Sequence, residues 1–142
     1  MDCSLCDFKT LKKQKLFETK NEFVIYNKWA ATKGQCMVVP KKHVQNIREM
    51  SDSELQSLIK TVQLVSDKLN SYLNPKGFNF GFNENKIAGQ DINHLHFHII
   101  PRYENDSISN NLLLPKPKTM KKLKDNKLNR TIEELKAQLE SF

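Results

Sequence analysis

The chain has 142 residues, of which 38% are hydrophobic and 27% charged, a balance that is ordinary for one soluble globular domain. It has no apolar run of the ~20 residues that cross a bilayer, and its first residues lack the basic-then-apolar order of a signal peptide. We therefore expect a cytoplasmic protein without a membrane partner. The net charge of +7 favours anionic ligands such as nucleotides or polyphosphates, and three cysteines argue against a disulfide scaffold.

The first half of the chain predicts two strands. Residues 22–27 and 35–39 are rich in aromatic and β-branched side chains, which fit a pleated sheet. Gly34 lies between them as a turn or bulge residue, and Pro40 ends the second strand because it has no N–H for the ladder. We expect these strands to form an antiparallel hairpin.

The clearest helix lies between residues 51 and 73, where apolar residues recur at intervals of three and four. Ser51 followed by Glu54 is a capping-box pattern, and Asn-Pro-Lys-Gly at 74–77 supplies a stop. Both ends of this helix are therefore marked in the sequence.

The second half predicts another hairpin and a shorter helix. Phenylalanines alternate with polar residues in a strand beginning at 78, a second alternating strand spans about 93–100, and the turn-rich connector 84–90 should approach it. We expect a basic, mobile loop at 115–130 and a helix at about 131–140. Lysines of that loop should favour polyanionic substrates: Lys116, Lys118, Lys121, Lys122, Lys124 and Lys127. The fold class is α+β, a mostly antiparallel sheet packed with one long helix and a C-terminal helix.

Three histidines occupy alternate positions of the second strand. His94, His96 and His98 should project from one face about 6–7 Å apart, while the residues between them face the core. Three imidazoles are costly to bury without partners, so their pattern indicates function. They could hold a catalytic metal, or one could attack phosphorus while a neighbour donates hydrogen bonds to the phosphate. A reference pKa of ~6.5 leaves the neutral nucleophile abundant, which suits the second chemistry.

The run His-Leu-His-Phe-His-Ile-Ile at 94–100 resembles the signature of the histidine-triad (HIT) superfamily of nucleotide hydrolases and transferases. Ala-Gly-Gln at 88–90 and Pro-Arg at 101–102 extend the likeness, which covers about residues 1–103. It implies a HIT-like domain core over 1–103, with the basic loop and C-terminal helix of 104–142 appended, and a homodimer that joins two sheets. Asn85 stands where many members have glycine, and Lys33 where a proline often precedes the glycine.

The resemblance also implies roles for individual residues. His96 would attack the α-phosphorus and become nucleotidylated, His98 would contact the phosphate and assist the leaving group, and Gln90 would hydrogen-bond near the scissile phosphate. Asn27 and Asn83 would line the nucleotide site, although asparagine is also common in turns and at strand ends.

The implied activity is hydrolysis or nucleotidyl transfer at the α-phosphate of a purine nucleoside phosphoramidate or dinucleoside polyphosphate, through a covalent nucleotidyl-histidine. One alternative is a nucleotide-binding regulatory module with little turnover. Another is an enzyme that processes nucleic-acid 5′-adenylate ends, but the sequence has no zinc finger or aromatic stacking platform, so nucleic acid is an unfavoured partner.

Cys3 and Cys6 have the spacing that lets two thiolates reach one zinc ion, which is half of a tetrahedral site. A redox pair or two ordinary cysteines are the alternatives. The resemblance to a zinc-binding, bacterial-type subgroup of the superfamily implies that His43 and His94 complete a structural zinc site. Cys36, within an apolar strand, is expected to be a small buried hydrophobe.

Overall fold

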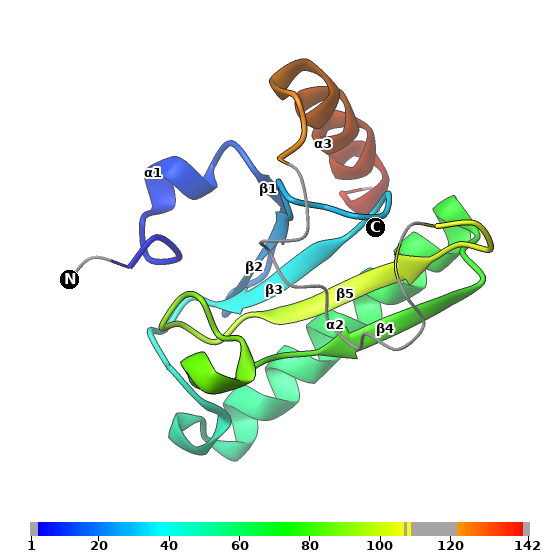
Figure 1. Ribbon diagram of the computed structural model, residues 1–142. Helices are drawn as coiled ribbons and strands as arrows, with labels where there is room; N and C mark the ends of the chain where they lie inside the picture. Colours follow the sequence, from blue (N-terminus) through cyan, green and yellow to red (C-terminus); the bar gives the residue numbers. More distant parts are fainter. Residues whose placement is uncertain (1–2, 107, 109–121, 141–142) are drawn as a thin grey trace.

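The structure is a computed structural model, and it describes residues 3–106, 108 and 122–140. Five strands form one antiparallel sheet in the order β1-β2-β3-β5-β4 (Figure 1). The α+β class and the mostly antiparallel sheet are thus as predicted. Along the chain the elements are α1 (Phe8–Leu11), β1 (Lys15–Glu18), β2 (Glu22–Tyr26), β3 (Cys36–Pro40), η1 (Ile47–Glu49), α2 (Asp52–Leu73), β4 (Gly77–Gly81), η2 (Lys86–Ala88), β5 (Phe97–Arg102) and α3 (Asp125–Leu139).

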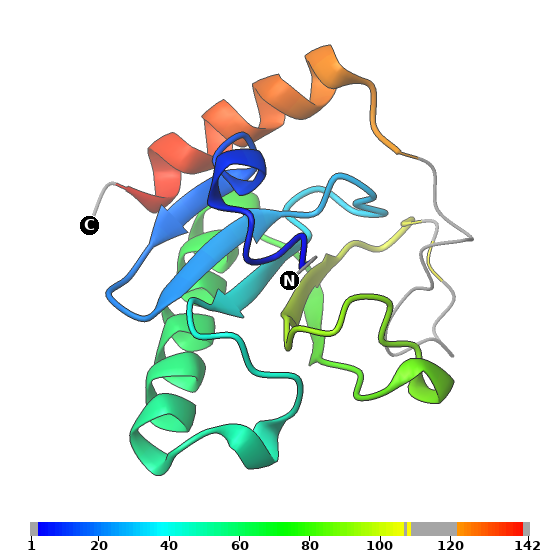
Figure 2. The ribbon, with the colours of Figure 1, turned by 90° about the vertical axis from the view of Figure 1, so that its left-hand side faces the viewer.

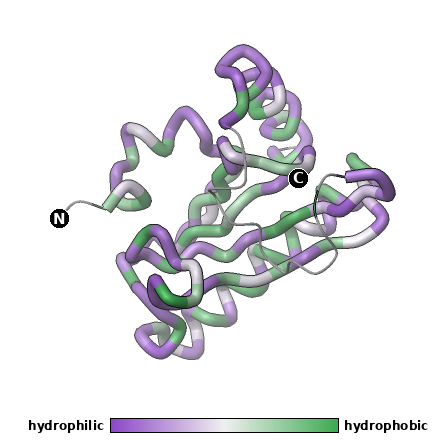
Figure 3. Tube along the Cα trace, in the orientation of Figure 1, coloured by the Kyte–Doolittle hydropathy of each residue, from purple (hydrophilic) through white to green (hydrophobic). Residues whose placement is uncertain are grey.

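The two faces of the sheet are covered by different parts of the chain. Alternation along β2 sends Val24 and Tyr26 into the main core, which α2 and α3 cover, and sends Phe23 and Ile25 to the opposite face. There the N-terminal segment contributes Leu5 and Leu11 to a smaller cluster. Figure 2 shows α2 and the N-terminal segment on opposite sides of the sheet, and Figure 3 shows hydrophobic residues along its central strands.

The long helix begins and ends where its signals predict. The Ser51 side chain accepts a hydrogen bond from the Glu54 backbone N–H, and the Glu54 carboxylate accepts one from the Ser51 backbone N–H, so the capping box is complete. At the other end Asn74 adopts the left-handed conformation, with φ 48°, and Pro75 follows. This helix packs against the sheet and supports β3 and β5 from behind.

The first hairpin also forms as predicted, with β2 and β3 paired in register from Glu22↔Pro40 to Tyr26↔Cys36. Gly34 has φ +95°, and a Cβ there would lie 2.6 Å from Cδ1 of Leu73. Both facts require glycine at this turn. Cys36 is completely buried, as expected, and burial raises the pKa of its thiol to about 12.

Several boundaries differ from the predictions. The histidine strand begins at Phe97 rather than near 93, because the chain bends at 92–94. The last helix begins at Asp125 rather than 131, because Leu128 is buried on the same helix face as Ile132, so 125–130 is not loop. Phe80 is 47% exposed, since β4 has no strand beyond it among the described residues. Neither α1 nor β1 was predicted.

Three lysines of the predicted basic loop, Lys116, Lys118 and Lys121, lie outside the described residues, and their role stays a prediction. The three described lysines, Lys122, Lys124 and Lys127, are exposed at or just before the start of α3, and their effect on substrate choice stays a prediction. None of the described helices has the length and apolarity that a membrane span requires.

Candidate active site and metal centre

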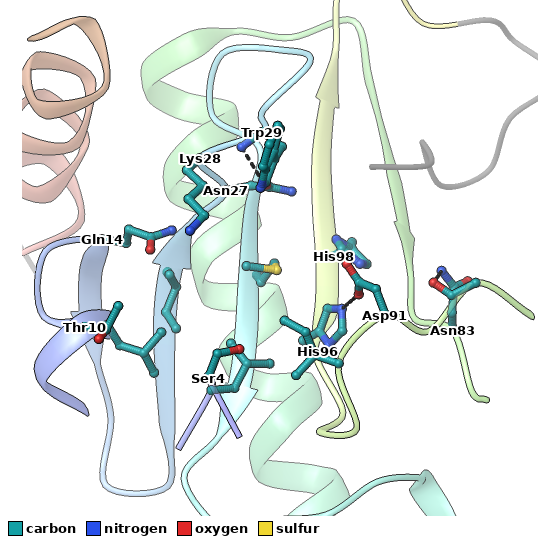
Figure 4. Close-up of a pocket in the computed structure, with 16 residues that line it drawn as sticks. Ser4, Thr10, Gln14, Asn27, Lys28, Trp29, Asn83, Asp91, His96 and His98 are labelled. Carbon is teal, nitrogen blue, oxygen red and sulfur yellow. Dashed lines mark hydrogen bonds and ion pairs between the residues drawn. The ribbon is translucent and has the colours of Figure 1, made fainter. Parts of the chain in front are cut away.

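A cleft of about 140 Å³ lies on the face of the sheet that the N-terminal segment covers. One wall is the N-terminal segment, the floor is formed by β2 and β3, and the opposite wall is the start of β5 with the loop 83–92 (Figure 4). Its lining residues are Ser4, Leu5, Thr10, Leu11, Gln14, Ile25, Asn27, Lys28, Trp29, Met37, Asn83, Gly89, Asp91, Ile92, His96 and His98. The cleft therefore brings together four of the residues expected at a nucleotide site.

The ring of His96 is fixed by the backbone of its own motif. Its Nδ1 lies 2.8 Å from the carbonyl oxygen of His94. A carbonyl can only accept, so Nδ1 carries the hydrogen and, in the neutral ring, Nε2 keeps its lone pair. The side chain is almost fully buried, yet it lines the cleft, and its Nε2 lies 3.6 Å from Oδ1 of Asp91. This is the arrangement that a nucleophilic nitrogen requires.

His98 in β5 lies next to His96, which directly precedes this strand, with 4.9 Å between the ring centroids. Burial, with a smaller contribution from the nearby His96, lowers the pKa of His98 to about 3. The ring is therefore neutral across the physiological range and offers one N–H donor. Its Nδ1 is buried and has no hydrogen-bond partner among the described residues.

The two asparagines lie on different walls of the cleft. Oδ1 of Asn27 accepts from the Trp29 backbone N–H at 2.8 Å, while its NH₂ group has no partner among the described residues. Nδ2 of Asn83 is 3.4 Å from the carbonyl oxygen of Gly89, so Asn83 also braces the loop. Asn27 is thus the better placed of the two to donate to a ligand in the cleft.

Four potential metal ligands gather beside this cleft, on the N-terminal side. Cys3, Cys6, His43 and His94 each offer one ligand atom, and these atoms lie within 4.8 Å of one another. Nε2 of His94 lies 2.8 Å from the carbonyl oxygen of Pro40, so Nε2 carries the hydrogen and Nδ1 faces the cluster with its lone pair. Burial lowers the pKa of His94, which favours the neutral form that binds metals.

The spacing of the four atoms fits a tetrahedral ion. Nδ1 of His94 is 3.4 Å from each cysteine Sγ and 3.2 Å from Nδ1 of His43, and Sγ of Cys6 is 3.3 Å from Nδ1 of His43. Zinc bonds of ~2.0–2.3 Å at tetrahedral angles separate neighbouring ligands by about 3.3–3.8 Å. The residues present therefore fit zinc in both ligand type and spacing.

Comparison with known proteins identifies the family to which the sheet and the histidine motif belong. The HIT domain family model matches residues 9–105, which include the sheet, α2 and the histidine motif. The chain belongs to the HIT family. In the first three curated relatives that match, this chain covers 57%, 74% and 65% of their lengths.

Three curated relatives illustrate the similarity, and the names of the last two state an activity. A HIT-like protein of Methanocaldococcus jannaschii is 49% identical over 52% of this chain and 57% of its own length. An adenosine 5′-monophosphoramidase of Schizosaccharomyces pombe is 32% identical over 62% and 63% of the two chains, and a bis(5′-adenosyl)-triphosphatase of Dictyostelium discoideum is 31% identical over 66% and 63%.

Two solved HIT structures share the fold. A histidine triad nucleotide-binding protein from Sulfolobus tokodaii has a TM-score of 0.79 at 27% identity and covers 97% of this chain and 92% of that one. A zinc-bound histidine triad protein from Mycobacterium smegmatis has a TM-score of 0.74 at 22% identity, covers 99% and 97%, and shares the fold.

Gln90 was expected to bind substrate, but it does not line the cleft. Its Oε1 accepts from the Asn85 backbone N–H at 2.7 Å, and its Nε2 donates to the carbonyl oxygen of Gln45 at 3.1 Å. Both ends of the amide thus hold the loop that carries Asn83 and Asp91. A direct hydrogen bond from Gln90 to the scissile phosphate stays a prediction.

Among the cleft residues that sequence reasoning missed are three large polar or aromatic ones: Lys28, Trp29 and Asp91. Lys28 and Trp29 follow Asn27 directly, so the end of the predicted strand was their only signal. Asp91 lies between Gln90 and the first histidine of the HIT motif, and nothing in its neighbours predicts the contact with His96.

Proposed function

We propose that this HIT protein is an enzyme that cleaves nucleotidyl compounds at the α-phosphorus through a covalent intermediate on His96. The observation that carries the proposal is the hydrogen bond from Nδ1–H of His96 to the His94 carbonyl, which leaves the Nε2 lone pair facing the cleft. Support comes from the two relatives named for cleaving adenosine compounds. A purine nucleoside is accordingly the proposed occupant of the cleft.

The proposed reaction has two displacement steps. In the first, Nε2 of His96 forms a bond to the α-phosphorus while the bond from phosphorus to the leaving group breaks, and the leaving group departs with the electron pair and gains a proton. In the second, water bonds to that phosphorus and loses a proton while Nε2 departs with its electron pair. The products are the leaving group and a nucleoside monophosphate, and His96 is regenerated.

The neighbouring side chains have supporting roles. The neutral ring of His98 donates its N–H to a phosphate oxygen and stabilises the charge that develops there. Asn27 and Asn83 donate to the nucleotide from the two walls of the cleft. Gln90 acts through the loop as a positioning residue, since both ends of its amide are bonded to backbone.

Cys3, Cys6, His43 and His94 are proposed to hold one structural zinc ion. When bound, zinc would supply four bonds that fix the N-terminal segment to the sheet, and it would take no part in the displacement. The support is the donor set of two thiols and two imidazoles, at spacings that a tetrahedral ion fits.

The homodimer implied by the family likeness is proposed to form at β4. This strand is paired on one side by β5, and the described residues place no strand on its other side. Phe80 on β4 is exposed there, and a two-fold pairing of β4 with its copy would cover it. Sedimentation velocity tests this: wild type should sediment as a dimer and Phe80→Asp as a monomer, whereas a monomeric wild type would contradict the proposal.

Pre-steady-state kinetics test the covalent step. Enzyme mixed with excess adenosine 5′-phosphoramidate should release ammonia in a burst of one equivalent per active site if water attack limits turnover, and intact-mass spectrometry after an alkaline quench should detect adenylylated protein. The adduct should be absent from His96→Asn. If wild type binds nucleotide tightly but neither forms the adduct nor turns over, the chain is a nucleotide-binding module, and the enzymatic proposal is wrong.

A further inference from the structure

The most unusual neighbour of the proposed nucleophile is a carboxylate. Oδ1 of Asp91 lies 3.6 Å from Nε2 of His96, and both residues line the cleft (Figure 4). The Asp91 side chain is 51% exposed, whereas that of His96 is 7% exposed. Because Nδ1 of His96 carries the hydrogen, a neutral ring has no proton on Nε2 to offer Asp91. The contact is also longer than a hydrogen bond. The carboxylate therefore faces the reaction centre without being neutralised by it.

The opposite charge that the cleft contains lies on another wall. Among the described residues that line it, Lys28 and Asp91 are the only ones with charged side chains, although the whole chain carries a net charge of +7. Lys28 follows β2, on the wall away from the loop that carries Asp91 (Figure 4). A divalent ion bound by two thiolates and two neutral imidazoles would add no net charge either.

Such a site discriminates between groups attached beyond the α-phosphate. When the phosphorus contacts Nε2, the leaving group attached to it lies within several ångströms of Asp91. At this separation, in a partly solvated site, two unit charges interact by about 1–2 kcal/mol. A further phosphate is repelled by this amount. An amine or amide N–H is not repelled, and it can donate a hydrogen bond to the carboxylate.

We propose that Asp91 is a charge filter that selects nucleotidyl compounds whose leaving group is an amine over those whose leaving group is a phosphate. The inference rests on the proposed function, since it concerns the substrate of that reaction. The names of the relatives include enzymes for both phosphoramidates and dinucleoside polyphosphates, and the proposed filter favours the first class over the second. Asp91 is in this sense a specificity-determining residue.

The test compares kcat/KM for adenosine 5′-phosphoramidate and for diadenosine triphosphate in wild type, Asp91→Asn and Asp67→Asn. Asp91→Asn keeps the shape of the side chain and removes its charge, and Asp67→Asn makes the same charge change on the exposed side of α2. We expect wild type to favour the phosphoramidate. In Asp91→Asn the ratio should shift about tenfold toward the triphosphate at low salt, and in Asp67→Asn it should stay within about twofold.

The outcomes separate the two proposals. If wild type and both variants cleave the substrates with one unchanged ratio, Asp91 is no filter, while the proposed reaction stands. If wild type cleaves neither compound, or His96→Asn cleaves both at wild-type rates, the proposed function itself fails. A ratio that moves toward the phosphoramidate in Asp91→Asn also overturns the filter, because it gives the carboxylate the opposite effect.

Discussion

His94 and His96 are two residues apart in one motif, yet the structure prepares their rings for opposite tasks. In His94 the Nε2–H donates to the carbonyl of Pro40, and the Nδ1 lone pair faces Cys3 and Cys6. In His96 the Nδ1–H donates to the carbonyl of His94, and Nε2 faces the cleft. The residue type is the same, so the difference comes from which ring nitrogen meets a backbone acceptor.

The largest expected effect comes from replacing each ring by asparagine. His96→Asn should lower kcat by a factor on the order of 10³ or more and leave bound metal unchanged, because it removes the nucleophile alone. His94→Asn should lose the metal, since it removes a ligand. Elemental analysis beside steady-state kinetics checks the pair. Equal loss of metal in both variants would mean that the two rings are not functionally separate.

Two cysteine variants test whether the cluster that contains His94 binds zinc. Cys6→Ser should abolish stoichiometric zinc and lower the free energy of unfolding by several kcal/mol, because metal-binding energy contributes to folding. Cys36→Ala is the matched control: its thiol is buried in the main core away from the cluster, so it should cost about 1–2 kcal/mol in packing and keep the zinc. Full zinc content in Cys6→Ser would remove that residue from the site.

A fall in pH should destabilise the folded protein through His98, because this buried histidine resists protonation. Its folded pKa is about 3 and its unfolded pKa about 6.5, so between these values the unfolded chain binds a proton that the folded chain does not. Its contribution to stability is therefore complete above pH 6.5 and is lost as the pH falls toward 3, by at most about 1.4 kcal/mol per pH unit.

Urea unfolding of wild type and His98→Gln at pH 7, 6 and 5 measures this contribution. Every other titrating group is common to both proteins, so the difference between their slopes belongs to His98. We expect the stability of wild type to fall more steeply with acid than that of the variant. Parallel slopes would show that His98 is protonated as readily in the folded protein as in the unfolded one.

The smallest effect concerns the loop that carries Asp91. Asn85 has φ 69° and ψ 154°, a region that glycine occupies far more readily than other residues. Asn85→Gly should therefore stabilise the fold by about 1 kcal/mol. Asn70→Gly, at an exposed position in α2, should destabilise it by about 0.3–0.5 kcal/mol, because glycine is a weaker helix former than asparagine. Thermal unfolding checks both signs, and a loss of stability in Asn85→Gly would be inconsistent with strain at this residue.

The sequence predicts this fold where local signals are strong. The capping box at Ser51 and the glycine turn at 34 depend on neighbouring residues, and both form as expected. The start of α3 was placed too late because Lys124 provides no side-chain cap there, while Leu128 reveals itself as core only once the helix packs on the sheet. Strand β1 was missed because four residues with two charges have little pattern of their own.

The site was predictable as a set of residues rather than as a set of contacts. Cysteine spacing pointed to Cys3 and Cys6, the family resemblance implied His43 and His94, and these four residues do cluster. No sequence pattern reveals that the Pro40 carbonyl, 54 residues away, orients His94. The same limit applies to Gln90, whose amide meets the Gln45 carbonyl across 45 residues instead of entering the cleft.

The N-terminal segment that carries Cys3 and Cys6 also forms one wall of the cleft, through Ser4, Leu5 and Leu11. A metal that holds this segment against the sheet thereby organises part of the nucleotide-binding surface. Thermodynamic linkage makes the coupling reciprocal: if metal tightens nucleotide binding by some factor, nucleotide tightens metal binding by the same factor. Zinc would then act as an allosteric effector of nucleotide binding. In turn, a higher nucleotide concentration would reduce the dissociation of zinc from the protein.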